Sequence, residues 1–154
     1  MKLTREDIQI KHLEAKDLKL FQKLIQLFQD VFEMENLTTA KEPYLKELLE
    51  KPDFIVFAVI YKEEIVGGLT AYELPLYYSQ CSEVFIYDLA IRTEFQRNGL
   101  GKMLLTYLKE YCKEKGIKQI FVAANEEDEY ALEFYHSSGG RPENVIHFNY
   151  TATD

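Results

Sequence analysis

Residues 83–101 read EVFIYDLAIRTEFQRNGLG, and this stretch decides the fold of the chain. The first nine residues, 83–91, are almost continuously apolar, which predicts a strand buried on both faces of a sheet. The run QRNGLG at 96–101 then opens an amphipathic helix, which Gly116 is predicted to end. The apolar face of that helix consists of Leu100, Met103, Leu104, Leu108 and Tyr111.

The QRNGLG turn is predicted to bind the phosphates of a ligand. Backbone N–H groups at a helix N-terminus lack carbonyl partners, and the helix dipole adds positive charge there. Gly99 and Gly101 allow close approach of a pyrophosphate, while Arg97 and Lys102 add charge-assisted contacts. The turn matches neither the nucleotide P-loop nor GxGxxG. On these residues alone, a purely structural turn is the competing interpretation.

The first third of the chain predicts one strand and two helices. Residues 8–13 alternate apolar and polar side chains as a strand does, and Asp17 is expected to cap the first helix. The apolar stripe of that helix consists of Leu18, Phe21, Ile25, Phe28 and Phe32. A second helix is expected over 41–50, with Pro43 in its first turn, and ENLTTA at 35–40 is the polar connection between the two.

The remaining segments predict five strands and two helices, the strand 83–91 and the helix after QRNGLG among them. FIVFAVIY (54–61) and IVGGLTAYE (65–73) predict a hairpin, in which Gly67-Gly68 indicates a bulge or a close backbone approach. A strand over 117–124, a short helix ending near Ser138 and a last strand over 144–150 follow. The order βααβββαβαβ favours an α/β sandwich, with a mixed sheet and helices on both faces, as one domain over residues 1–154.

The composition is that of an ordinary globular protein with an acidic balance. The 154 residues include 18 Lys and Arg against 26 Asp and Glu, a formal charge of −8. This charge opposes nucleic-acid binding and favours a cationic small-molecule partner. With no apolar leader and no long apolar run, we expect a cytoplasmic protein without membrane contact. Cys81 and Cys112 are expected to be small buried side chains, and no metal is assigned because the three His lack metal-binding spacing.

The segment DEYALEFYHSSGG at 128–140 is a second candidate site. Ala131 and Phe134 fall on one helical face, and Tyr135 lies beside them near the helix C-terminus. A phenol in this position can donate a proton to a departing thiolate. Because the chain contains 11 Tyr, simple packing is the alternative role for Tyr135.

The two segments together resemble the GNAT superfamily of acetyl-CoA-dependent N-acetyltransferases. The signature loop of that family, Q/R-x-x-G-x-G/A after a central strand, is matched by Gln96, Arg97, Asn98, Gly99, Leu100 and Gly101. Its second signature is an Asn followed by A-x-x-(L/F)-Y and a glycine break, matched by Asp128, Ala131, Phe134, Tyr135 and Gly139. The strand and helix order over residues 8–150 also fits this family.

Within the superfamily, the chain is similar to the small aminoglycoside 3-N-acetyltransferases. The similarity lies in IYDLA at 86–90, in the acidic residues 126–128 before the helix, and in the pair His147-Phe148 near the C-terminus. Asp128 departs from the general superfamily Asn but matches this subgroup. The subgroup resemblance rests on short motifs of ordinary strand residues.

The resemblance implies a GNAT-type, mostly antiparallel sheet and a direct transfer of acetyl from acetyl-CoA to an amine, without an acyl-enzyme. The strands carrying 88–91 and 120–124 are expected to splay apart around pantetheine. The residues expected to hold the cofactor are Leu89, Ala90, Ile91, Gln96, Arg97, Asn98, Gly99, Leu100, Gly101, Lys102 and Tyr135. A backbone N–H near Leu89 or Ala90 would stabilise the oxyanion, and Tyr135 would protonate the thiolate.

The attacking amine needs a carboxylate that attracts its ammonium form and accepts a proton. Asp128 and Glu126 are the first candidates and Asp88 is the second, with a solvated surface role as the alternative for each. An aminoglycoside 3-amino group is the leading acceptor. A polyamine or a Lys side chain satisfies the same electrostatics. The second hypothesis is a GNAT enzyme that acts on another metabolite amine, a polyamine or a protein N-terminus, and the third is a non-catalytic acyl-CoA sensor. The Tyr77-Tyr78 loop is expected at the substrate rim or in a homodimer contact.

Overall fold

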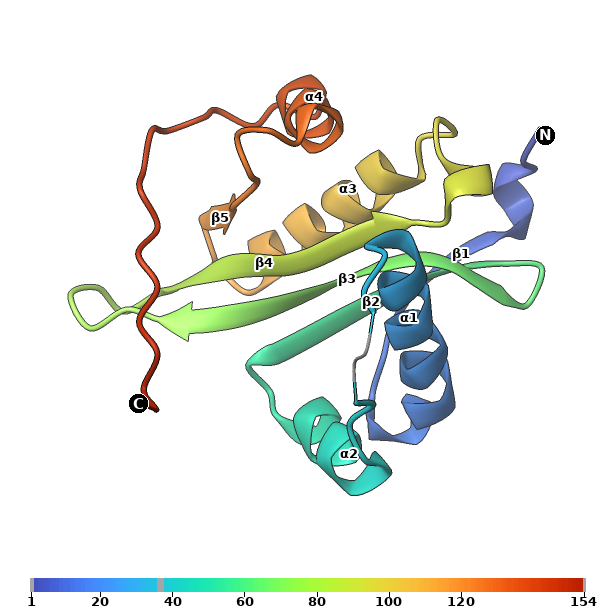
Figure 1. Cartoon of the computed structure of the whole chain (residues 1–154), viewed down its shortest axis with the longest axis horizontal. Helices are drawn as coiled ribbons and strands as arrows, with labels where there is room; N and C mark the ends of the chain where they lie inside the picture. Colours follow the sequence, from blue (N-terminus) through green and yellow to red (C-terminus); the bar gives the residue numbers. More distant parts are fainter. Residues whose placement is uncertain (1, 36–37, 154) are drawn as a thin grey trace. The chain divides into compact units, whose positions relative to one another are not determined.

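The structure is a computed structural model that describes residues 2–35 and 38–153. The chain divides into two compact units, Met1–Ala123 and Ala124–Asp154. The first contains a five-stranded sheet with three helices, and the second contains one helix and the segment that follows it (Figure 1). Asn36 and Leu37 of the expected polar connection lie outside the described residues. Whether the two units act as one domain stays a prediction.

Five strands make up the sheet, in the order β1-β2-β3-β4-β5. They are β1 (Ile8–His12), β2 (Phe54–Tyr61), β3 (Glu64–Pro75), β4 (Ser82–Ile91) and β5 (Gln119–Val122). Neighbours pair antiparallel except β4 and β5, which are parallel. The mixed, mostly antiparallel sheet predicted from the sequence is therefore confirmed.

Helices cover both faces of this sheet (Figure 1). On one face, α1 (Leu18–Val31) and α2 (Glu42–Glu50) bury Leu24 and Leu45 in a cluster with Val56 of β2. On the other face, α3 (Leu100–Glu114) presents Tyr107, whose ring lies 4.9 Å from that of Phe57. Three short 3₁₀ turns (Arg5–Asp7, Ala15–Asp17 and Thr93–Phe95) complete the first unit, and α4 (Glu129–Ser137) lies in the second. No helix of the described residues has both the length and the apolar composition that a bilayer crossing requires.

The glycine pair in β3 lets α1 lie close to the sheet. A Cβ at Gly68 would stand 2.6 Å from Leu24 Cδ1 of the helix and 2.6 Å from the carbonyl oxygen of Phe57. The register of β2 against β3 shifts between Val59 and Ile60, opposite Gly67. Both the bulge and the close approach predicted from Gly67-Gly68 are therefore present.

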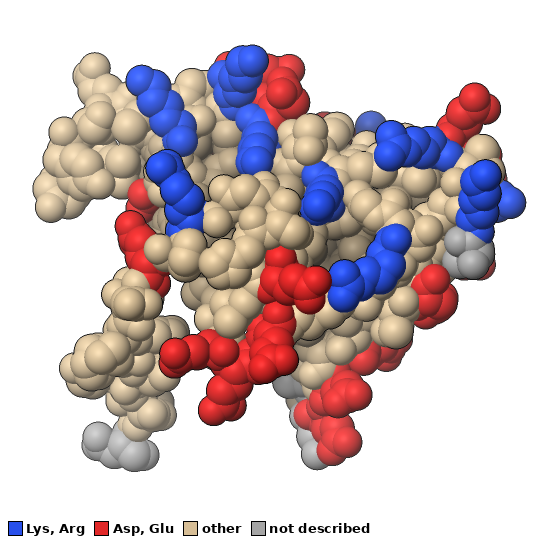
Figure 2. Space-filling model, turned by 90° about the horizontal axis from the view of Figure 1, so that it is seen from above, with Lys and Arg blue, Asp and Glu red and all other residues tan. Residues whose placement is uncertain are grey.

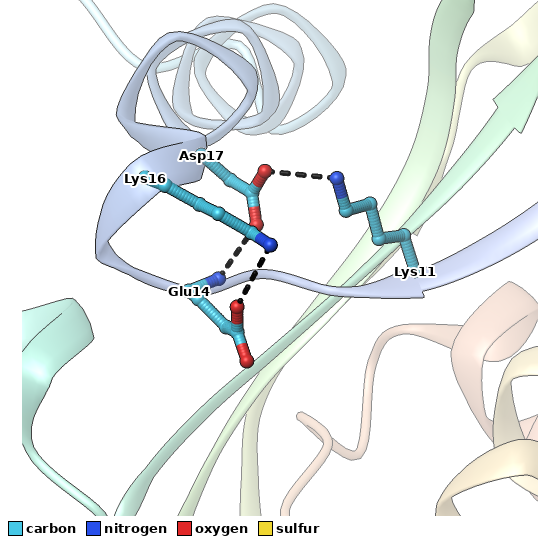
Figure 3. Close-up of polar contacts among 4 residues, drawn as sticks. All are labelled: Lys11, Glu14, Lys16 and Asp17. Atoms are coloured by element: carbon cyan, nitrogen blue, oxygen red, sulfur yellow. Dashed lines mark hydrogen bonds and ion pairs between the residues drawn. The ribbon is translucent and has the colours of Figure 1, made fainter.

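The turn before α1 is held by a buried carboxylate (Figure 3). Asp17 Oδ1 accepts from Lys11 Nζ at 2.9 Å, and Asp17 Oδ2 accepts from the backbone N–H of Glu14 at 2.9 Å. Asp17 stands at the N-cap position as predicted, but its side chain turns back to the preceding turn and does not cap α1. Burial raises the pKa of this carboxyl, and the two hydrogen bonds outweigh it, so that the net pKa lies below the ordinary value.

The predicted last strand over 144–150 is not formed. These residues carry no regular structure, and the large apolar side chains among them, Val145, Ile146, Phe148 and Tyr150, are 70–92% exposed. A strand needs a neighbouring strand to take its backbone hydrogen bonds, and no strand lies in the described part of the second unit. The apolar alternation alone was therefore insufficient.

Smaller differences also follow from the surroundings of each residue. Tyr87 is 64% exposed and Phe85 half-buried, so β4 is not buried on both faces along its whole length as predicted. On α3, Leu105 and Cys112 are buried, whereas Met103 and Tyr111 are only half-buried. Phe32 follows the end of α1 and is exposed. The strand predicted over 117–124 is shorter, because β5 pairs only over Gln119–Val122.

Candidate functional site

The parallel strands β4 and β5 are paired only along the first half of β4. β5 pairs with β4 from Glu83↔Gln119 to Ile86↔Val122 and no further. At the parting point, Thr70 of β3 faces Asp88 and Ala71 faces Ile86, so Tyr87 is the extra residue of a bulge. Residues 88–91 therefore pair with β3 alone, as the predicted splay requires. The splay prediction is wrong for residues 120–122, which stay paired with the first half of β4.

The backbone of Leu89 is turned toward the side that β5 has left. The N–H of Arg92 donates to the carbonyl of Val66 at 2.8 Å, which places this pair in hydrogen-bonded register. In an antiparallel ladder, directly opposite pairs alternate between bonded and non-bonded. Ala90 therefore faces Gly68 with its backbone groups, whereas Leu89 and Ile91 direct theirs away from β3. The carbonyl of Ile91 already accepts from Gln96 Nε2 at 2.9 Å.

The turn before α3 is shaped by its own side chains. Asn98 Nδ2 donates to the carbonyls of Phe95 and Gln96, at 3.1 and 2.9 Å. Arg97 and Gly99 both adopt positive φ, 64° and 79°, and Gly99 is the N-cap residue of α3. A Cβ at Gly99 would meet no atom within 4 Å, so the backbone angle and not crowding requires glycine here. The first-turn N–H groups of α3 thus emerge from an ordered loop.

Asp88 is a half-buried carboxylate beside this parted strand. Burial raises the pKa of its side chain, and it lies in register with buried Thr70 on β3. Nearby, the Tyr72 and Tyr87 rings are 6.0 Å apart. Burial also raises the pKa of Tyr72, and the charges of neighbouring groups, Asp88 and Asp53 among them, raise it further. A carboxylate with a raised pKa holds a proton more readily, which suits a group that receives one.

Sequence reasoning missed Tyr72 as a neighbour of Asp88. Tyr72 lies on β3 and Asp88 on β4, so no local motif joins them. Only the register between Thr70 and Asp88, with the bulge that follows, brings these strands together at this point.

The second unit positions the other predicted residues. Asp128 is the N-cap of α4, and its Oδ1 accepts from the N–H of Ala131 at 3.1 Å. The carbonyl of Tyr135 accepts from the N–H of Gly140 at 2.8 Å and from Ser138 Oγ at 3.1 Å, which closes the end of the helix. Glu126 is exposed. Asp88 and residues 89–102 belong to the first unit, whereas Glu126, Asp128 and Tyr135 belong to the second.

The cysteines differ from each other. Cys112 is buried in α3, where burial raises the pKa of its thiol to about 11 and keeps it protonated. Cys81 is exposed, contrary to prediction, because it lies in the loop before β4, where its Sγ contacts Ser79 Oγ at 3.3 Å.

Across residues 2–35 and 38–153, no three His, Cys, Asp or Glu side chains are grouped to hold a metal ion. Figure 2 shows that one face of the molecule carries both signs of charge.

Two features together point to one class of protein: β4 and β5 are parallel but pair over only half of β4, and the helix after β4 begins at a glycine N-cap. The acetyltransferase (GNAT) family model matches residues 21–139, and the chain belongs to this family of acyl-CoA-dependent acetyltransferases. The solved relatives include an aminoglycoside acetyltransferase from an uncultured soil metagenomic sample, meta-AAC0020, in complex with sisomicin. It is 41% identical, with a TM-score of 0.94 over 97% of this chain and 99% of that chain.

Two further solved structures are similar. The same soil protein in complex with trehalose is 42% identical, with a TM-score of 0.94 over 96% of this chain and 98% of that one. A second soil metagenomic aminoglycoside acetyltransferase, HMB0005, is 35% identical, with a TM-score of 0.90 over 95% of this chain and 99% of that one. The resemblance to GNAT enzymes predicted from the two sequence signatures is therefore confirmed.

Proposed function

We propose that this protein transfers an acetyl group from acetyl-CoA to an amine of an aminoglycoside, with the 3-amino group as the leading position. The observation that supports the transfer chemistry is that β4 no longer pairs with β5 after Ile86 and continues unpaired on that side toward the N-terminus of α3. The acceptor class is supported by similarity to the sisomicin-bound relative.

The chain's own groups fit a CoA thioester. Leu89 offers an outward backbone N–H and C=O to a pantetheine chain, in the place that β5 leaves. Gly99 shapes the turn so that the first-turn N–H groups of α3 and the side chain of Lys102 receive phosphates. The remaining expected contacts, from Gln96 to Gly101, belong to this same turn. Acetyl-CoA supplies the acetyl group as an activated thioester.

For the reaction itself, Leu89 is the better of the two expected oxyanion donors. Its N–H points into the space beside β4, whereas that of Ala90 is directed toward Gly68 of β3. A backbone N–H aimed at the developing negative oxygen lowers the barrier without reorganisation.

Among the three candidate carboxylates, Asp88 now comes first. It is half-buried with a raised pKa and precedes Leu89 directly, whereas Asp128 uses one carboxylate oxygen to cap α4. Asp88 attracts the ammonium form of the acceptor and accepts its proton. The neutral nitrogen then bonds to the acetyl carbon, the carbon–sulfur bond breaks, and Tyr135 donates its phenol proton to the departing sulfur. The second proton of the nitrogen passes through water to the Tyr135 phenolate, and Asp88 releases the first proton to solvent, so the products are the neutral amide and free CoA thiol.

The test is a thiol-release assay with purified protein, acetyl-CoA and sisomicin, followed by NMR of the product to locate the new amide. We expect saturable thiol release and acetylation at the 3-amino group. Acetylation at another amine would keep the drug class and reject the position. Thiol release only with polyamines, metabolite amines or peptide N-termini would reject the aminoglycoside.

Tyr135→Phe separates an enzyme from an acyl-CoA sensor. We expect kcat to fall by about 10²–10⁴-fold while calorimetric affinity for acetyl-CoA is kept, because only the proton donor is lost. Tyr130→Phe, on the same helix, is the matched control and should keep full activity. Equal and negligible turnover in all three proteins, with tight acetyl-CoA binding, would favour the sensor.

A further inference from the structure

Four aromatic side chains lie in one row across the sheet, one on each of four neighbouring strands. Phe54 of β2 is paired with Tyr72 of β3, and their ring centroids are 5.2 Å apart. Tyr72 is paired with Phe85 of β4, which is paired in turn with Phe121 of β5 and stacks on it at 4.9 Å. Paired residues point to the same face of a sheet, so all four rings lie on one face. Tyr87 lies beside this row, 6.0 Å from Tyr72 and 6.1 Å from Phe85.

The helices cover only one end of this row. Phe54 is buried, with the ring of Phe21 of α1 at 5.9 Å, and Tyr72 packs against the same cluster. Beyond them, Tyr87 and Phe121 are 64% and 38% exposed. We call Tyr72, Phe85, Tyr87 and Phe121 the aromatic floor. Large exposed aromatic side chains that lie together mark a surface that contacts a partner.

Two carboxylates lie beside the aromatic floor. Asp88 is the register partner of Thr70, which lies two residues from Tyr72 on β3, so Asp88 is on the same face as Tyr72. Burial raises the pKa of the Tyr72 phenol, and the charges of neighbouring groups, Asp88 and Asp53 among them, raise it further. Both carboxylates therefore act electrostatically on this end of the floor, in a chain whose formal charge is −8. The surface thus joins apolar rings to negative charge.

An aminosugar ring complements such a surface in two ways. Its C–H faces pack against aromatic rings, and its ammonium groups are attracted both by carboxylates and by the negative faces of those rings. A linear polyamine satisfies only the charges, because it has no rigid ring face to lay on the floor. The two strand spacings between β3 and β5 amount to about 10 Å, so the floor is longer than one six-membered ring.

We propose that the aromatic floor binds a sugar ring of the acceptor and selects ring-shaped polycations over linear ones. The reacting amine lies beside Asp88, and the next ring of the acceptor extends over Tyr87 and Phe121 toward β5. Tyr87 and Phe121 are then specificity-determining residues, because they touch the acceptor away from the bond that forms. The inference rests on the proposed acetyl transfer and deepens it by naming the surface that distinguishes one acceptor from another.

Isothermal titration calorimetry with sisomicin and with spermine tests the floor without requiring turnover. We expect Tyr87→Ala and Phe121→Ala each to weaken sisomicin binding by about 3–10-fold, the contribution of one aromatic contact, and to leave spermine binding unchanged. Tyr107→Ala is the matched control, because its ring is 39% exposed, as much as that of Phe121, but lies on α3 against the other face of the sheet. It should bind both ligands as wild type does.

Tyr87→Phe keeps the ring and should bind sisomicin with wild-type affinity, and circular dichroism verifies that each variant folds. In the thiol-release assay, Tyr87→Ala and Phe121→Ala should raise KM for sisomicin by the same factor at nearly unchanged kcat, because the reacting groups are untouched.

The outcomes separate the floor from the transfer. Sisomicin affinity that is unchanged in both alanine variants, or weakened equally by Tyr107→Ala, would overturn the floor and leave the transfer standing. Equal weakening of sisomicin and spermine would reject the preference for rings. Sisomicin binding that depends on the floor, with no thiol release by wild type, would overturn the proposed transfer alone. No sisomicin binding by wild type would overturn both.

Discussion

Two carboxylates in the first unit, Asp17 and Asp88, have surroundings that shift their pKa values in opposite directions. Asp17, in the turn before α1, is met by Lys11 Nζ and by the N–H of Glu14, both at 2.9 Å, and its pKa is lowered. Asp88, on the second half of β4, is half-buried at a bulge, and burial raises its pKa. The folded chain stabilises the charge of the first and disfavours the charge of the second.

The difference separates a structural carboxylate, Asp17, from a candidate functional one, Asp88. A buried charge that is hydrogen-bonded on both oxygens belongs to the architecture, because its removal leaves polar partners unsatisfied. A carboxylate held in a partly desolvated place costs stability, and such costs are concentrated at sites that act on a ligand. On this comparison, Asp17 fixes the entry to α1, and we propose that Asp88 handles the proton of the acceptor amine.

The largest expected effect is on catalysis by Asp88→Asn. We expect kcat/KM for the aminoglycoside to fall by about 10²–10⁴-fold, because the amide cannot accept the proton of the ammonium. The free energy of unfolding near neutral pH should rise, because a neutral side chain replaces a disfavoured charge. Steady-state kinetics and urea unfolding measure the two quantities on the same preparation.

Asp128→Asn is the matched control for that experiment. Asn caps a helix as well as Asp does, so α4 is kept while the charge is removed. We expect at most a small loss of activity. If Asp128→Asn instead abolishes transfer while Asp88→Asn does not, the base is Asp128, which would restore the order of candidates that the sequence favours.

Most of the fold could be predicted because its signals are local. The period of apolar residues located α1, α2 and the β2–β3 hairpin to within a few residues, and Gly116, with φ of 73°, follows the end of α3 as predicted. The strand over 144–150 could not be predicted correctly in the same way. Its alternation is a local property, whereas a strand exists only beside a neighbouring strand, and residues 144–150 pair with none among the described residues.

Only part of the candidate site can be read from the sequence, for a similar reason. Gly99 and the turn around it are contiguous in sequence, so their pattern is readable. The proposed choice of Asp88 over Asp128 as the base depends on burial, on the bulge at Tyr87 and on the end of β5 pairing at Ile86. These are properties of strand register, and register is decided by contacts between distant segments.

On the other side of the comparison, Asp17→Asn is expected to lower stability and leave catalysis alone. The amide loses the ion pair with Lys11 and presents only one acceptor oxygen to two donors, which should cost about 1–3 kcal/mol in the free energy of unfolding. Urea titration monitored by circular dichroism measures the loss. A decline in kcat/KM per folded molecule comparable to that of Asp88→Asn would break the distinction between the two acids.

Asp17 and Asp88 should each contribute to the pH dependence of stability, and the two contributions should have opposite signs. Asp17, whose folded pKa lies below the ordinary 3.8, contributes stability that is present above 3.8 and is lost as pH falls through its folded value. Asp88, whose folded pKa lies above 3.8, contributes stability that increases as pH falls through that raised value. Asp17→Asn should reduce the loss of stability that occurs as pH falls through the folded pKa of Asp17. Asp88→Asn should remove the gain of stability that occurs at higher pH, as pH falls through the folded pKa of Asp88. Unfolding midpoints in denaturant at a series of pH values measure both.

The glycines at the two ends of α3 allow a closely matched comparison of stability with acetyl-CoA affinity, with the smallest effects expected. Gly99 and Gly116 have φ of 79° and 73°, and at neither would a Cβ meet an atom within 4 Å. Gly99→Ala and Gly116→Ala should therefore each cost about 1–2 kcal/mol through the left-handed backbone alone. Only Gly99→Ala should weaken acetyl-CoA binding in isothermal titration calorimetry, because only that end of the helix has backbone N–H groups without helical partners, and we propose these as the phosphate donors. Equal affinities in the two variants would leave the QRNGLG turn with a purely structural role.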